Sequence, residues 1–164
     1  MNKITKITFE KLPESVEDIK NIDRTNPQLV AATAIAAFCN FEKNPDAVLE
    51  MVDFLNGPSD VSNYDRNFLR ERLKGKYYKP FSFFEGSSPE NDYKPTLPYT
   101  ISIIEGPYAH QDEGYIGFYV KSSGADSPRP IKVRLKPSTG EWFLWGEIML
   151  FSDIRIPKSE DPRA

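Results

Sequence analysis

The stretch "IKVRLKPSTGEWFLWGE", from Ile131 to Glu147, carries the clearest structural pattern of this 164-residue chain. Apolar and basic residues alternate over 131–136, and residues 141–147 alternate with the same period of two, which is typical of β-strands that bury one face. The four residues "PSTG" between them suit a hairpin loop. The stretch therefore predicts two antiparallel strands joined by a short turn.

The register of this hairpin places three cations on one strand face. A four-residue loop pairs Lys136 with Glu141, Arg134 with Phe143 and Lys132 with Trp145. Aromatic rings and one carboxylate then cover the basic face, and each cation–π contact is worth about 0.5–1 kcal/mol. A solvated strand face that protects the sheet edge is the favoured interpretation, and a ligand site is the alternative.

Further strands are predicted on both sides of the hairpin. The segments "YTISIIE" (99–105), "YIGFYVK" (115–121) and "MLFSDIRI" (149–156) are rich in β-branched and aromatic residues. Short, turn-rich connections between strands favour antiparallel pairing. The second half of the chain therefore predicts a mainly antiparallel sheet of about five strands.

The first half of the chain carries helix signals instead. Asn26–Pro27 and Asn44–Pro45 each combine a capping side chain with a proline in the first helical turn. Helices are predicted in a short segment capped by Ser15, from Pro27 to about Phe41, from Pro45 to Leu55, and from Ser62 to Leu73.

These elements predict an α+β fold in which about four N-terminal helices pack on the C-terminal sheet. No flexible linker separates the halves, so residues 1–157 are predicted to form a single domain, with a disordered tail over 158–164. The long loop 83–98 is marked by proline and glycine. A loop of this length is typically either functional or ordered by its own aromatic side chains.

Composition narrows the possible partners and the compartment. The net charge of −3 argues against a nucleic-acid partner. The single cysteine, Cys39, excludes an intramolecular disulfide, and the N-terminus lacks the apolar core of a signal peptide. The longest apolar run, 29–39, is shorter than the roughly 20 residues of a membrane-spanning helix. We expect a cytoplasmic protein that binds neither membranes nor nucleic acid.

Several chemistries lack the residues that they need. With one histidine, His110, and one cysteine, no zinc site of Cys and His ligands is possible, and no glycine-rich phosphate loop occurs. A nucleophile assisted by imidazole would have to use His110, and Cys39 lies in an apolar run that favours a buried thiol. The sequence therefore names no metal site, no cofactor and no catalytic residue.

The stretch "SSGADSPRPIKVRLK" (122–136) is the main candidate for a ligand site. Prolines on both sides hold Arg129 on a stiff, extended segment, so that little conformational entropy is lost when its planar fork binds an anion or a carboxylate. Asp126 lies in the turn before it, and Lys132 and Arg134 extend the basic surface along the strand. These residues are the candidates for an anion-recognising surface, which is the alternative to the favoured solvated strand face.

Two further features extend this candidate surface. Arg66 and Arg70 lie one turn apart on a predicted helix, where they could form a second anion contact, although an ordinary solvated helix face is favoured. The aromatics of loop 83–98 could form a platform for a sugar or peptide, although a plug between helices and sheet is favoured. The expected contact surface joins Arg129 and its neighbours to this loop.

Three phrases carry a resemblance to a known family: "SNYDRNFLRERL", "PFSFFEGSSPENDYKPTLPYTI", and "GADSPRPIKVR" followed by "GEWFLW". Together they resemble an uncharacterised bacterial domain of unknown function, met mostly in Firmicutes such as clostridia. The likeness spans about Leu12 to Pro157. It implies a stand-alone bacterial domain, and it supplies no activity, cofactor or catalytic residue to carry over.

The leading hypothesis is a non-catalytic binding or interaction module of the bacterial cytoplasm, whose partner is a protein, a peptide or a small anionic ligand. The first alternative is an enzyme of unrecognised type, a hydrolase or transferase acting on an anionic substrate through carboxylates or His110. It predicts a deep pocket that contains an acidic residue with a shifted pKa. The second alternative is a structural oligomerisation domain, which predicts a large apolar face shared between subunits.

Overall fold

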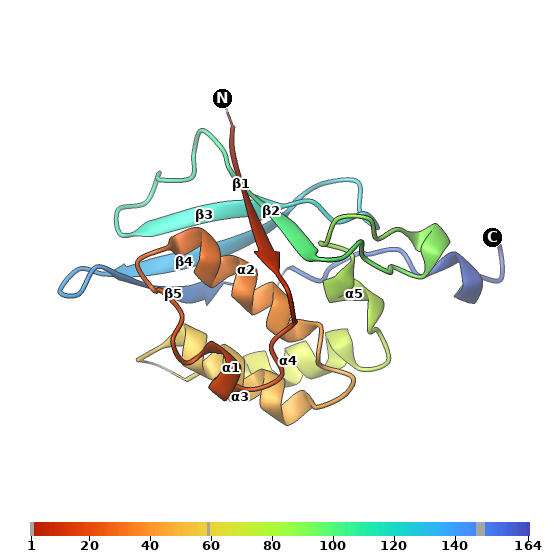
Figure 1. Ribbon diagram of the computed structural model, residues 1–164, viewed down its shortest axis with the longest axis horizontal. Coiled ribbons are helices and arrows are strands. Elements are labelled where there is room, and N and C mark those ends of the chain that lie inside the picture. The colour runs from red at the N-terminus through yellow and green to blue at the C-terminus, as the bar shows by residue number, and fades with distance from the viewer. Residues whose placement is uncertain (1, 59, 147–149) are drawn as a thin grey trace.

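The computed structural model describes residues 2–58, 60–146 and 150–164 and has an α+β fold (Figure 1). Within these ranges one antiparallel sheet contains five strands in chain order: β1 (Lys3–Phe9), β2 (Tyr99–Glu105), β3 (Tyr115–Val120), β4 (Arg129–Lys136) and β5 (Glu141–Gly146). Each strand pairs antiparallel with its neighbour. The predicted fold class and the mainly antiparallel sheet are confirmed.

One predicted strand is wrong, and one observed strand was not predicted. Residues 150–153 form a turn and 154–156 belong to no strand, while Met149 lies outside the described residues. Leu150 and Phe151 are both fully buried, which is incompatible with a strand that alternates between a buried and an exposed face. The strand that was not predicted is β1, which brings the number of strands in the described sheet to five. Its sequence "KITKITF" alternates with a period of two.

The predicted hairpin is present between β4 and β5, with one shift in its register. Two predicted pairs are confirmed, Lys136 with Glu141 and Arg134 with Phe143. Lys132 pairs with Gly146 rather than with Trp145, because the register shifts between Lys132 and Val133. Such β-bulges re-aim the side chains beside them, which a simple count of residues across the turn does not foresee.

The helices are α1 (Val16–Ile19), α2 (Pro27–Phe38), α3 (Pro45–Asn56), α4 (Asn63–Leu73) and α5 (Tyr78–Phe81), with 3-10 turns η1 (Pro89–Asn91) and η2 (Lys158–Glu160). The Asn26 and Asn44 side chains each accept from a backbone N–H at 3.1 Å, which confirms both caps. Within the part of the chain that the structure describes, no helix combines the length and the apolar character needed to cross a membrane.

Helix α2 lies directly against the sheet and forms the centre of the core. From Val30 to Phe38 its side chains are buried on every side, because α2 packs against strands on one side and α3 on the other. Its alanines are small, so neighbouring elements can approach closely. Figure 1 shows α3 and α4 on the side of α2 that faces away from β3 and β4. We call the face of the sheet that points away from α2 the outer face.

The long loop 83–98 and the C-terminal segment are packed against each other and against the core. Phe83, Phe84 and Tyr93 of the loop are buried. The Ser159 hydroxyl donates to Asp92 Oδ1 at 2.5 Å, and Lys158 Nζ lies 3.3 Å from a Glu90 carboxylate oxygen. Residues 158–160 of the segment predicted to be a disordered tail therefore form η2 and contact the loop.

Candidate functional site

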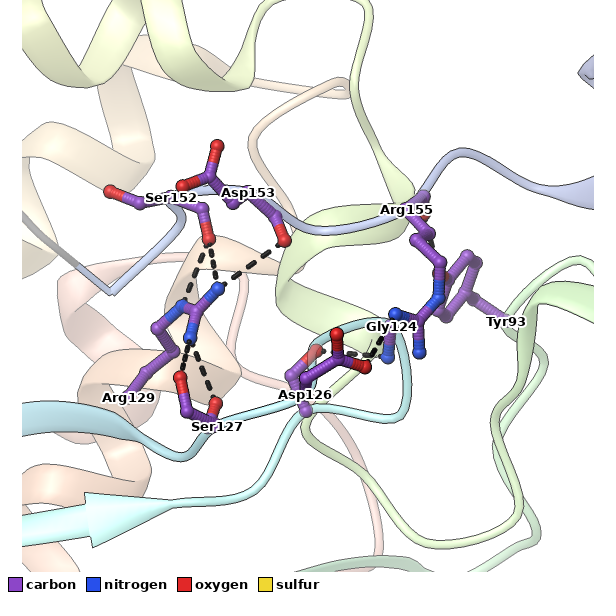
Figure 2. A network of polar contacts seen from close by, with 9 residues as sticks. Tyr93, Gly124, Asp126, Ser127, Arg129, Ser152, Asp153 and Arg155 are labelled. Carbon is purple, nitrogen blue, oxygen red and sulfur yellow. Dashed lines mark hydrogen bonds and ion pairs between the residues drawn. The ribbon is translucent and has the colours of Figure 1, made fainter.

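Arg129, the arginine between two prolines, is enclosed by oxygen atoms of the protein (Figure 2). Its Nε and one terminal nitrogen donate to the Ser152 carbonyl at 2.9 and 2.6 Å, and the same terminal nitrogen lies 3.3 Å from the Asp153 carbonyl. The other terminal nitrogen donates to the Ser127 carbonyl at 2.8 Å and to its hydroxyl at 3.0 Å. An anion could reach this fork only by replacing these contacts.

A second cation, Lys79, holds the preceding carbonyl of the same segment. Its Nζ donates to the Phe151 carbonyl at 3.0 Å, and the side chain is only 5% exposed. Burial, together with repulsion from Lys76 and Arg72, lowers the pKa of Lys79 to about 8. Lys79 and Arg129 therefore donate to the carbonyls of three successive residues, 151–153, which belong to no helix or strand.

The rest of segment 150–155 is fixed by equally close contacts (Figure 2). The Tyr93 hydroxyl donates to the Arg155 carbonyl at 2.5 Å, and burial raises the pKa of Tyr93 to about 12. The Arg155 N–H donates to the Gly124 carbonyl at 2.8 Å, and its guanidinium pairs with Asp126 at 2.9 Å. We call this region the joint: segment 150–155 with Lys79, Tyr93, Gly124 and Arg129.

Lys132 and Arg134 lie farther along β4, on the outer face, among aromatic rings. The Arg134 guanidinium carbon lies 4.9 Å from the ring centre of Trp145 and 5.6 Å from that of Tyr115. Lys132 Nζ lies 5.5 Å from the Tyr115 ring centre and 3.6 Å from an Asp112 carboxylate oxygen. Cation–π contacts were predicted here, and the register shift changes which rings supply them.

The outer face holds an open hollow of about 500 Å³, which we call the outer cleft. Its walls include the rings of Tyr115 and Tyr119 from β3, Trp145 from β5, and Tyr108 from the connection between β2 and β3. Figure 1 shows this connection rising on the side of the sheet away from α2. Tyr108, Tyr119 and Trp145 are 79%, 45% and 48% exposed, so the cleft presents open aromatic surface.

Gly117 keeps the floor of the outer cleft open. It lies between Tyr115 and Tyr119 on the outer face of β3, and a Cβ built on it would meet no atom within 4 Å. Its N–H donates to the Ala109 carbonyl at 2.9 Å, which ties the overlying connection to the strand. Glycine weakens a strand interior, and it often marks a bulge or a place where a ligand or another backbone segment approaches closely.

A second hollow, of about 330 Å³, lies beside the outer cleft and reaches the end of α3, because Asn56 and Pro58 line it together with residues of β4 and β5. Trp145 lines both hollows, and Arg134, Lys136 and Pro137 line the second. The floor of the second hollow includes Phe143, whose ring lies 4.5 Å from the Arg24 guanidinium carbon. We call it the basic hollow, since two cations of β4 border it.

The two arginines of α4 lie apart from both regions. Arg66 pairs with Asp53 of α3, and its Nε donates to the Val61 carbonyl at 3.2 Å, so that it braces the turn between α3 and α4. Arg70 lies 3.8 Å from an Asp46 carboxylate oxygen at an exposed position. Neither is brought to β4, and α4 lies on the side of α2 away from the sheet (Figure 1).

The reactive side chains of the described residues are dispersed. The His110 ring pairs with Glu105 on the connection beside the outer cleft. Burial raises the pKa of the Cys39 thiol well above its usual value, which disfavours the nucleophilic thiolate. Among residues 2–58, 60–146 and 150–164, no cluster of His, Cys, Asp or Glu side chains is arranged to hold a metal ion.

The residues that make the outer cleft were not predicted as a group. Tyr115, Gly117 and Tyr119 come from one strand, and Trp145 was considered only as a cover for Lys132. The available signal was a glycine between two tyrosines at a period of two, which places all three on one strand face. Tyr108 had no such signal, because its position depends on the path of the connection between β2 and β3.

Comparison with known proteins places the chain in a family. A model of a domain of unknown function (DUF6935) matches residues 11–158, and the chain belongs to this family. No curated protein and no solved structure matches the chain.

Proposed function

We propose that this chain is a non-catalytic binding module of the bacterial cytoplasm that holds its ligand in the outer cleft. The observation that carries the proposal is an open aromatic cleft whose floor is a strand glycine. Its volume of about 500 Å³ lies within the range of about 300–1,000 Å³ that is usual for ligand sites. The single cysteine of the chain is consistent with a reducing compartment.

The candidate residues on β4 and in the turn before it have two different roles. Lys132 and Arg134 border the hollows of the outer face and are assigned to ligand contact. Arg129 and Asp126 belong to the joint and its contacts, and they are assigned to holding β4 in position. Arg66 and Arg70 are assigned no ligand contact.

The placement of perturbed groups favours a binding module over an enzyme. An enzymatic site typically collects groups with displaced pKa values in its cleft. Lys79 and Tyr93, with pKa values of about 8 and about 12, lie in the joint, where each donates to a backbone carbonyl. Such contacts suit holding the fold together.

A thermal-shift screen tests the cleft as the ligand site. The purified protein and Gly117→Val are screened against nucleotides, carboxylated and phosphorylated metabolites, oligosaccharides and short acidic peptides. A ligand at about 100-fold excess over its Kd stabilises its binding protein by about 2.7 kcal/mol, which is a shift of several degrees for a domain of this size. We expect the shift in the wild-type chain and its loss in Gly117→Val.

The glycine variant separates binding from folding. A Cβ at Gly117 meets no atom within 4 Å, so valine should obstruct the floor of the cleft while the melting temperature without ligand stays near that of the wild type. Arg70→Ala on α4 is the matched control and should keep the ligand-induced shift. A ligand that stabilises wild type and Gly117→Val equally would place the site elsewhere and refute the proposal.

A further inference from the structure

The two hollows of the outer face form one elongated surface. The outer cleft and the basic hollow share Trp145 as a common wall, and together they extend across β3, β4 and β5. A ligand confined to one hollow would leave the exposed ring of Trp145 in contact with solvent on its other side. A ligand that runs across both hollows covers both sides of this ring. The shape therefore favours an extended occupant.

Arg134 lines the basic hollow beside Trp145, the wall that the two hollows share. Its guanidinium contacts the rings of Trp145 and Tyr115, at 4.9 and 5.6 Å from the ring centres. Among the described residues, no carboxylate or carbonyl accepts a hydrogen bond from it. Arginine carries five N–H donors in a planar fork that matches a carboxylate. Ring contacts that restrict an otherwise flexible side chain lower the entropy lost on binding.

Both charged residues that line the basic hollow are positive, although Glu141 lies opposite Lys136 across the hairpin and the chain is negative as a whole. Arg134 and Lys136 line it, and its other described lining residues carry no charge. Lys132 stands at the boundary with the outer cleft, near Asp112. The net charge of the whole chain is −3. The local positive charge therefore selects a negatively charged group for the basic hollow.

The outer cleft has the surface that extended proline-rich segments bind. Exposed rings of Tyr108, Tyr119 and Trp145 line it together with Pro107 and Pro130. Polyproline II segments dock in aromatic-lined grooves, and they lose little entropy because their conformation is already fixed.

We propose that the occupant is an extended, acidic, proline-containing peptide segment of a partner protein, with its prolines on the rings of the outer cleft and a carboxylate on Arg134. This inference rests on the proposed function and names the chemistry of its ligand. The prolines supply apolar contact with the tyrosines, and the carboxylate pairs with the guanidinium fork that has no acceptor among the described residues. Lys132 and Lys136 add attraction along the path.

The test uses synthetic peptides and fluorescence anisotropy at low salt. The probes are labelled peptides with a run of about eight prolines, which forms polyproline II, and a pair of glutamates before, within or after the run. Matched probes carry lysines in place of the glutamates, or a flexible glycine–serine run in place of the prolines. We expect at least one glutamate–proline peptide to bind at least about tenfold more tightly than either matched probe.

Variants of the full chain assign the contacts. Arg134→Gln should weaken the glutamate–proline peptide about tenfold, because it removes one charge-assisted pair, and should change the affinity of an uncharged proline run by less than about twofold. Arg134→Lys retains the charge without the fork and should fall between. Gly117→Val should abolish binding of all probes, while Arg70→Ala should leave every affinity unchanged.

The outcomes separate this inference from the proposed function. If no glutamate–proline peptide binds below about 1 mM, or if the lysine probes bind equally well, the peptide inference is refuted. If an oligosaccharide or a phosphorylated metabolite binds instead and Gly117→Val abolishes it, the cleft remains a binding site and only the peptide is wrong. If the chain dimerises in sedimentation and Trp145→Ala dissociates it, the occupant is a second copy and the inference is refuted.

Discussion

The two ends of β4 use arginine in opposite ways. At its start, Arg129 donates to carbonyls of Ser127, Ser152 and Asp153 and locks the joint. Later on the same strand, Arg134 contacts the rings of Tyr115 and Trp145, and its N–H donors have no acceptor among the described residues. One arginine is a structural brace, and the other packs against aromatic rings on the outer face.

The difference arises from what lies opposite each side chain. Segment 150–155 belongs to no helix or strand, and the cations Lys79 and Arg129 donate to the carbonyls of 151–153, which offsets the cost of burying these groups. At the other end, β5 satisfies the backbone of β4, and the outer face presents rings and solvent. The role of a surface arginine therefore depends on the unsatisfied acceptors that the fold brings near it.

The largest effect should come from adding one methyl group in the joint. A Cβ on Gly124 would overlap the Tyr93 hydroxyl and lie 2.8 Å from Ile154 Cγ2. Gly124→Ala should lower the free energy of unfolding by about 3 kcal/mol, because overpacking adds to the loss of the bond between Tyr93 and Arg155. Urea unfolding monitored by tryptophan fluorescence measures this change.

The same substitution on the outer face is the matched control. Gly117→Ala adds its methyl group in open space and relieves part of the entropic cost of a strand glycine. We expect the free energy of unfolding to stay within about 1 kcal/mol of the wild type. Equal losses in the two variants would mean that the outer face is packed as tightly as the joint, and the comparison would fail.

The two arginines of β4 provide the second test. Arg129→Met removes a charged donor and leaves the carbonyls of residues 152–153 without the hydrogen bonds that it supplies. We therefore expect the free energy of unfolding to fall by about 2–3 kcal/mol. Arg134→Met removes ring contacts alone and should cost less than about 1 kcal/mol. Paired urea titrations measure both, and a loss at Arg134 as large as that at Arg129 would contradict the assigned roles.

Local signals in the sequence predicted the local parts of the fold. The caps Asn26 and Asn44, and the hairpin pairs at Arg134 and Lys136, depend on residues within a few positions, and they were predicted correctly. The segment 149–156 was predicted as a strand because it is rich in residues of high β-propensity. Such propensity depends on context, since it reflects how side chains pack on a half-buried sheet surface. In the fold, Phe151 is fully buried in a turn held by side chains from distant parts of the chain.

Non-local contacts explain what the sequence left undetermined at the candidate site. Arg129 lies between prolines and Arg134 between apolar strand residues, but neither pattern shows that the Ser152 and Asp153 carbonyls, more than twenty residues beyond Arg129, accept hydrogen bonds from it. The outer cleft combines β3, β5 and the connection after β2, and no short stretch contains this combination. The alternation around Gly117 could have placed part of the cleft, but the position of Tyr108 could not have been predicted.

A smaller effect, of opposite sign, is expected from the other cation of the joint. Lys79 is buried, and its pKa is lowered from 10.5 to about 8, so the folded state holds its charge at a cost below that pH. Lys79→Met removes this cost and leaves the Phe151 carbonyl without its donor, which costs about 1 kcal/mol. The variant should be more stable than the wild type by about 2 kcal/mol at neutral pH.

The pH dependence of this gain distinguishes desolvation of a charge from better packing. Between the folded pKa of about 8 and the unfolded value of 10.5, the unfolded wild-type chain binds more protons at Lys79, so wild-type stability should rise with pH there. The gain from Lys79→Met should shrink over that window, whereas exposed Lys74→Met should show no such trend. If the gain is independent of pH, the buried charge of Lys79 costs little. The ammonium would then have other acceptors in addition to the Phe151 carbonyl. If the variant is less stable at neutral pH, the bond to Phe151 outweighs the buried charge, and both cations of the joint act alike as braces.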